Sequence, residues 1–199
     1  MTEFFTAGSC FASLAFVALV AYAHLQRHEL DRASTPLSAY FSGHTRGVML
    51  AAYFCLSVAL VCAAMKIIPE HGGIVSGVGP VSGFLMLIAA ASLIPVALTA
   101  RSELSADTRS VRTQSMHRKF AFVAFIAVAV AMVAYSVLGF PSDHRYQRAI
   151  RVWAVFVSLF ALMAFMLLRS LPPGSRHYGL IQKILVASVA TWLFISAWA

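Results

Sequence analysis

The chain has 199 residues, of which 60% are apolar and 11% are charged, and its net charge is +8. Soluble domains carry about 25% charged residues, so this composition excludes an ordinary soluble protein. The basic residues are divided among short segments between apolar ones, without a basic helix or a basic strand interleaved with aromatic residues. This pattern excludes a nucleic-acid partner and predicts contacts with membrane lipids.

Apolar segments long enough to cross a bilayer follow one another along the chain. A helix rises about 1.5 Å per residue, so a hydrocarbon core of about 30 Å needs about 20 apolar residues. The segments of this kind are residues 7–25, 47–68, 74–100, 120–140, 150–171 and 179–198. Because backbone groups in lipid must pair within their own element, we predict an all-α fold. It is a polytopic transmembrane bundle of six helices, with residues 1–199 as a single integral membrane domain.

The third and fourth segments carry the clearest packing signals. Pro80 and Pro95 in the third predict a late start, a tilt or a kink. Small residues recur in the fourth at helical spacing: Ala124, Ala127, Ala131 and Ala134. Since small side chains let helices approach closely in lipid, these alanines predict a packing seam.

The basic residues predict the orientation in the membrane. Eleven of them lie in or near the first, third and fifth connections: Arg27, Arg32, Arg46, Arg101, Arg109, Arg112, Arg118, Lys119, Arg169, Arg176 and Lys183. Four lie in the other two connections: Lys66, Arg145, Arg148 and Arg151. The positive-inside rule therefore places the odd connections in the cytoplasm and both termini outside, in an inner or plasma membrane.

Polar residues gather at the same end as the odd connections. The histidines at that end are His24, His44, His117 and His177. The other candidates there are Ser38, Tyr40, Asp107, Thr113, Gln182 and Lys183. One interpretation is that these side chains simply populate the membrane interface. The interpretation that we favour is a polar site that binds a lipid headgroup or a partner membrane protein, which includes a second copy of this chain. Its ligand-binding candidates are Tyr40, Asp107, Thr113, His117, Gln182 and Lys183.

Three further functions stay open. A haem or metal site would use His24, His44, His117 and His177. However, these histidines lie at span ends and match no compact metal-binding motif, so we predict no cofactor. A lipid hydrolase or transferase would use Ser38 as nucleophile, His117 as base and Asp107 to orient it, although no nucleophile-elbow motif is present. A transporter of lipids or small molecules is the last alternative, and it lacks a charged residue at mid-bilayer depth.

Three short patches resemble a known family. Residues 34–40 read Ser-Thr-Pro-Leu-Ser-Ala-Tyr and precede Gly43, similar to an H-P-[LI]-S-x-Y…G signature. Asp107, Thr113 and His117 resemble a D…T…H segment that enters the fourth span. Residues 179–183 and Trp192 resemble a closing G-x-x-Q-[RK]…W. The chain thus resembles domain of unknown function family 998, a group of small polytopic bacterial and archaeal membrane proteins.

The resemblance implies a six-span architecture and no particular activity. It distinguishes Ser38, Tyr40, Asp107, Thr113, His117, Gln182 and Lys183 from the other polar residues. The chain departs from the family pattern at Thr35, where a histidine would precede the proline. The resemblance also implies outward-facing motif loops, opposite to the orientation that the basic residues predict, and we follow the basic residues.

Overall fold

The computed structural model describes residues 2–31, 33–69, 77–100, 108–139, 145–172 and 175–198. Within these ranges the chain forms six α-helices and no β-strand. The helices are α1 (Thr2–Gln26), α2 (Arg46–Ile67), α3 (Val78–Thr99), α4 (Thr108–Ala134), α5 (Arg145–Ser170) and α6 (Tyr178–Ala197). All six regions are long and apolar enough to cross a membrane. The chain is therefore a multi-pass membrane protein with the predicted all-α fold.

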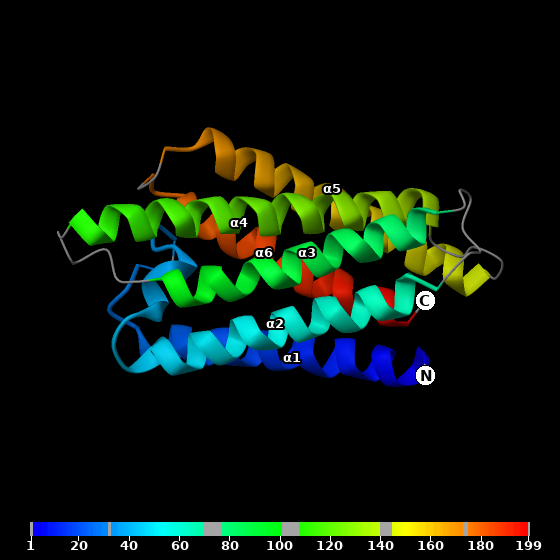
Figure 1. Cartoon of the computed structure of the whole chain (residues 1–199), viewed down its shortest axis with the longest axis horizontal. Coiled ribbons are helices and arrows are strands. Elements are labelled where there is room, and N and C mark those ends of the chain that lie inside the picture. Colours follow the sequence, from blue (N-terminus) through cyan, green and yellow to red (C-terminus); the bar gives the residue numbers. More distant parts are fainter. Residues whose placement is uncertain are drawn as a thin grey trace.

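The helices form an elongated bundle with both termini at one end (Figure 1). Helix α2 packs between α1 and α3, α3 packs on α4, and α6 contacts α1, α2, α4 and α5. Helix α5 packs mainly on α6 and less extensively on α4. Of the most apolar stretch of each helix, 56% is buried inside the bundle for α6, but only 17% for α1 and 28% for α5. Most of the surface of α1 and α5 therefore faces lipid.

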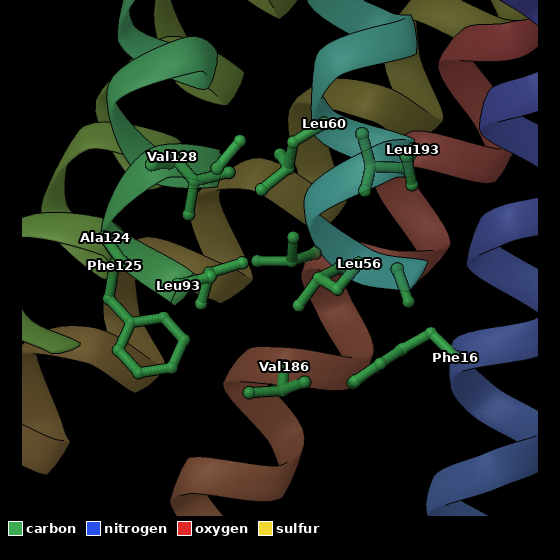
Figure 2. Close-up of a cluster of buried hydrophobic side chains, with 14 of the residues drawn as sticks. Phe16, Leu56, Leu60, Leu93, Ala124, Phe125, Val128, Val186 and Leu193 are labelled. Atoms are coloured by element: carbon green, nitrogen blue, oxygen red, sulfur yellow. The ribbon is translucent and has the colours of Figure 1, made fainter. Parts of the chain in front are cut away.

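The core lies where α2, α3, α4 and α6 meet. Leu56, Leu60 and Leu93 point into it from α2 and α3 and are at most 3% exposed. Val128 and Leu193 meet them from α4 and α6 (Figure 2). The predicted alanine seam of α4 lies on the inner side of that helix, since its first three residues are buried: Ala124, Ala127 and Ala131. These small side chains let α4 pack closely on its neighbours.

Helices α2 and α3 approach closely at Gly83. A Cβ atom added there would lie 2.5 Å from Cγ1 of Ile68 and 3.1 Å from the carbonyl oxygen of Ala64. Helix packing in lipid relies on such close contacts, because there is no hydrophobic force between helices already surrounded by apolar tails.

Helices α1, α3, α4 and α5 each begin four or more residues away from the start of the corresponding apolar segment. Helix α4 begins at Thr108, well before the apolar segment that starts at residue 120. Hydropathy marks the part of a helix that lies in hydrocarbon, whereas the polar residues before it continue the same helix. Helix α3 begins at Val78, so Pro80 lies in its first turn, where the missing N–H removes no helical bond, and Pro95 lies inside. Residues 74–76 of the third predicted span lie outside the described residues.

Polar contacts also fix the end of the bundle that holds the termini. The Lys66 ammonium, only 8% exposed, donates hydrogen bonds to the carbonyl oxygens of Ser196 (2.9 Å) and Ala197 (3.2 Å) at the end of α6. A π-helix follows α4 at Tyr135–Gly139, where the Ser136 hydroxyl accepts a hydrogen bond of 2.8 Å from Nε1 of Trp192. The last carbonyl groups of α6 thus accept hydrogen bonds from the Lys66 ammonium, and the π-helix after α4 accepts one from the Trp192 indole.

Candidate functional site

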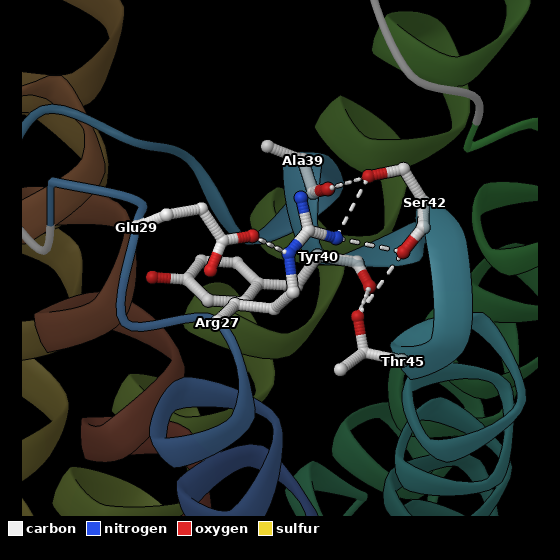
Figure 3. Close-up of polar contacts among 6 residues, drawn as sticks. All are labelled: Arg27, Glu29, Ala39, Tyr40, Ser42 and Thr45. Carbon is white, nitrogen blue, oxygen red and sulfur yellow. Dashed lines mark hydrogen bonds and ion pairs between the residues drawn. The ribbon is translucent and has the colours of Figure 1, made fainter.

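The connection between α1 and α2 crosses the other end of the bundle and is stabilised by hydrogen bonds between its own residues. We call its described residues, 27–31 and 33–45, the strap. Arg27 pairs with Glu29 and donates hydrogen bonds from one guanidinium nitrogen to the carbonyl oxygen (2.8 Å) and hydroxyl (3.0 Å) of Ser42 (Figure 3). The Thr45 hydroxyl donates to the carbonyl of Tyr40 at 2.8 Å. The strap contains two short 3₁₀ helices, Leu37–Phe41 and Gly43–Thr45, and the Thr45 bond joins the second to the first.

Two exposed carboxylates reinforce the first half of the strap. The hydrogen bond from Arg27 lowers the pKa of Glu29. The Asp31 carboxylate accepts hydrogen bonds from the Ser34 hydroxyl (2.6 Å) and the Ala33 amide (3.0 Å), and the hydroxyl bond lowers the pKa of Asp31. These bonds are stronger to ionised carboxylates, so this part of the strap is best ordered above the carboxylate pKa values.

The strap docks on the first turns of α6 through backbone contacts. The Leu180 amide donates to the carbonyl of Ala33 at 2.8 Å, and the Leu37 amide donates to Oε1 of Gln182 at 2.9 Å. A Cβ atom at position 179 would lie 2.3 Å from the Thr35 carbonyl oxygen, so only glycine lets the two backbones come this close. The first and third family-like patches of the sequence thus pack directly on each other.

Tyr40 lies at the centre of this docking surface and is fully buried. Its ring stacks on the His24 imidazole, with 4.3 Å between ring centroids, and Nζ of Lys183 lies 5.3 Å from its centroid in a cation–π contact. The sequence analysis assigns Tyr40 and Lys183 to a ligand site. In the structure they join α1, the strap and α6 to one another.

His117 joins α4 to the end of α3. Its Nδ1 lies 3.0 Å from the carbonyl oxygen of Val96 and 3.5 Å from the Thr99 hydroxyl. A carbonyl oxygen only accepts, so Nδ1 carries the proton in this contact. Thr113 lies one turn earlier on α4, and both side chains are half-buried. Thr113 and His117 of the second family-like patch therefore lie where α4 packs on the end of α3, beside the docked strap.

A cavity of about 350 Å³ lies between the strap, α4, α5 and α6. Ser38, His117 and Gln182 contribute polar groups to its lining. Its apolar wall includes Phe122, Phe125, Phe165 and Leu168. The size and the mostly apolar wall with a few polar groups are typical of sites for small ligands.

Among the described residues, the charged side chains that line this cavity are all basic. Arg118 from α4 and Arg169 from α5 line it, and no acidic residue does so among the described residues. The Arg169 guanidinium lies 5.0 Å from the ring centroid of Phe122, which is 41% exposed. A second, more open hollow adjoins the cavity, shares these three residues and adds Lys119. Three cations therefore surround an opening on the outer face of α4 and α5.

The structure separates the predicted site residues into groups. Ser38, His117 and Gln182 line one cavity, whereas Tyr40 and Lys183 hold the strap on α6. Asp107 lies outside the described residues.

The histidines proposed as metal ligands are dispersed in the same way. His44 and His177 are exposed, His24 stacks on Tyr40, and only His117 lines the cavity. The described part of the chain contains no group of three His, Cys, Asp or Glu side chains that could hold a metal ion.

Sequence reasoning missed the basic and aromatic residues of the cavity. Arg118 and Arg169 contribute to the sequence prediction only as topology signals, and that prediction gives no role to the phenylalanines of the cavity. The available signal was that both arginines end apolar segments on the same predicted side. It becomes specific only when α5 is known to lie beside α4.

The family of this chain follows from its comparison with known proteins. Neither the curated proteins nor the solved structures yield a match to this chain. A family model with the description "Protein of unknown function (DUF998)" matches residues 10–199, nearly the whole chain. The chain therefore belongs to this family, as the three motif patches predict.

Proposed function

We propose that the cavity binds the headgroup of an anionic membrane lipid. The observation that carries this proposal is that Arg118 and Arg169 both line the cavity together with an aromatic wall, without an acidic residue among the described residues that line it. Arginine presents a planar fork of donors that matches a phosphate, and it is less strongly hydrated than lysine. The phenylalanine wall offers the adjoining surface for the first part of an acyl chain.

The position of the opening supports a ligand that comes from the bilayer. Phe122 and its neighbour Val123 are exposed on the flank of α4, within the stretch Thr113–Gly139 that is apolar enough to lie in a membrane. Helix α5 covers this flank only in part. A lipid could therefore place its headgroup among the arginines while its chains stay in the adjacent leaflet.

In our proposal, the distribution of the basic residues places this site on the cytoplasmic side of the membrane. The strap, the start of α4 and the end of α5 lie at the end of the bundle opposite the termini (Figure 1). Under the positive-inside rule this end faces the cytoplasm of an inner or plasma membrane. Anionic lipids of the cytoplasmic leaflet are attracted to juxtamembrane basic residues by about 1 kcal/mol each. A reporter enzyme that is active only outside the cytoplasm should accordingly be active when it is fused to the C-terminus.

Lipid retention in nanodiscs tests the proposal. Protein reconstituted with phosphatidylglycerol and phosphatidylcholine should retain the anionic lipid when it is released for native mass spectrometry. Replacing both Arg118→Gln and Arg169→Gln should weaken this retention about 30-fold, from about 1 kcal/mol for each basic residue. Arg148→Gln is the matched control, because Arg148 is exposed on α5 near the opposite end of the bundle. Equal retention in the double variant and the control would refute the site.

A second candidate is a hydrolase or transferase that acts on such a lipid. Ser38 and His117 line the same cavity, as this function requires. A serine-reactive phosphonate should then label Ser38, and the label should be lost in both Ser38→Ala and His117→Ala. Absence of labelling in the wild-type protein argues for binding alone.

A further inference from the structure

The side-chain amide of Gln182 is oriented by the strap. Its Oε1 accepts the Leu37 amide at 2.9 Å, and an N–H donor fixes which end of the carboxamide faces it. The NH₂ group therefore occupies the other end of the carboxamide. Gln182 is 9% exposed and lines the cavity. The NH₂ group makes no hydrogen bond to a described residue, and its nitrogen is not one of the fully enclosed polar atoms that lack a partner, so it retains access to the cavity that Gln182 lines.

The Ser38 hydroxyl is a second polar group of the same kind. It comes from the strap, is half-buried, lines the cavity, and makes no hydrogen bond within the described ranges. Together the amide of Gln182 and this hydroxyl supply donors and an acceptor without charge. A ligand group that both accepts and donates hydrogen bonds, such as an alcohol, complements them.

The charged and uncharged polar groups belong to different parts of the site. Arg118 and Arg169 are exposed at the α4–α5 opening, whereas Gln182 is buried on α6. A water molecule occupies about 30 Å³ in the liquid, so a cavity of about 350 Å³ has room for about a dozen groups of that size. A bare phosphate at the arginines would leave much of this space unoccupied, including the part next to the amide of Gln182 and the hydroxyl of Ser38.

We infer that the site selects a phosphodiester lipid whose headgroup carries hydroxyl groups beyond the phosphate, such as a phosphoglycerol or another phosphopolyol. This inference rests on the proposed function and names the lipid class. The phosphate lies between Arg118 and Arg169, and the hydroxyl-bearing substituent extends inward to the amide of Gln182 and the hydroxyl of Ser38. A headgroup that ends in an ammonium lacks the acceptor for Gln182 and is repelled by the arginines.

Two lipids of equal charge provide the test. Phosphatidylpropanol has the phosphodiester of phosphatidylglycerol but lacks its two free hydroxyls. In nanodiscs that contain both lipids in equal amounts with phosphatidylcholine, wild-type protein should retain phosphatidylglycerol over phosphatidylpropanol by about three- to tenfold, as expected for one or two hydrogen bonds. Gln182→Met should move this ratio toward 1. Ser38→Ala, which breaks no hydrogen bond within the described residues, should lower it without affecting folding.

The outcomes separate the two claims. Equal retention of the two anionic lipids by wild-type protein, both above phosphatidylcholine, would overturn the hydroxyl selectivity and leave the anionic site standing. No preference for either anionic lipid over phosphatidylcholine would overturn the proposed function itself. Should Gln182→Met fail to fold because the Leu37 amide loses its acceptor, an unchanged ratio in Ser38→Ala would still contradict the inference.

Discussion

Replacing Gly179 by alanine would create a steric overlap where the strap packs on α6. The added Cβ atom would lie 2.3 Å from the carbonyl oxygen and 2.6 Å from the carbonyl carbon of Thr35. Both are backbone atoms, so no side-chain rotation relieves the overlap. Either the two backbones stay in place under strain, or the strap lifts from α6.

The expected cost follows from the cheaper of these two responses. Overpacking of a rigid contact costs about 1–3 kcal/mol. Lifting the strap removes the bonds from Leu180 to Ala33 and from Leu37 to Gln182, at about 0.5–1.5 kcal/mol each. We therefore expect Gly179→Ala to lower the free energy of unfolding by about 1–3 kcal/mol.

Thermal unfolding in mild detergent measures this loss, and trypsin identifies its cause. A chain of this size loses about 2–4 °C in Tm per kcal/mol. If the strap lifts, cleavage after Arg27 should accelerate, because Arg27 is held by Ser42 in the docked strap. Gly47→Ala is the matched control, since nothing lies within 4 Å of a Cβ atom there. A Gly179→Ala protein with the Tm and cleavage rate of the wild type would refute the reasoning.

Three other predictions concern contacts elsewhere: two from single substitutions and one from a change of pH. Lys66→Met removes the buried donor from the last carbonyls of α6 and should lower stability in thermal unfolding by about 1–3 kcal/mol; an unchanged Tm would contradict the capping role. Trp192→Phe loses the hydrogen bond to the π-helix and should cost about 1 kcal/mol by the same measurement, with no loss expected if the bond is incidental. The pKa values of Glu29 and Asp31 are lowered in the folded chain, so their contribution is present above the unfolded pKa values and is lost as pH falls through the folded ones. Acidification below about pH 4 should therefore reduce the protection of the strap amides against hydrogen exchange relative to neutral pH, after correction for the intrinsic pH dependence of exchange. The Glu29→Gln, Asp31→Asn double variant should show little of this change, and an equally large change would exclude these carboxylates as its cause.

The transmembrane helices could be predicted from the sequence because hydropathy and backbone pairing in lipid leave few alternatives. The start of α4 could not, since the polar residues between Thr108 and Phe120 give no apolar signal although they continue the helix. Pro80 shows the same limit: only the observed start of α3 at Val78 places it in a first turn.

The candidate site was predictable only as a set of residues at one end of the bundle. Ser38, His117 and Gln182 do meet at one cavity. Lys183 follows Gln182 directly, yet it points to the buried ring of Tyr40, because neighbouring residues on a helix project in different directions. Which of the two faces the cavity depends on the path of the strap, and that path is set by the close contact at Gly179.

Under the proposed function, the opening on the α4–α5 flank determines how the affinity for a ligand is to be expressed. A ligand that enters sideways from a leaflet never crosses bulk water, so its supply is set by its mole fraction among neighbouring lipids. Every lipid that passes competes for the same opening, and a modest preference repeated over many exchanges fixes the occupancy. Discrimination between headgroups then matters more than tight binding, and a weak, rapidly exchanging site would suffice for a sensor of leaflet composition.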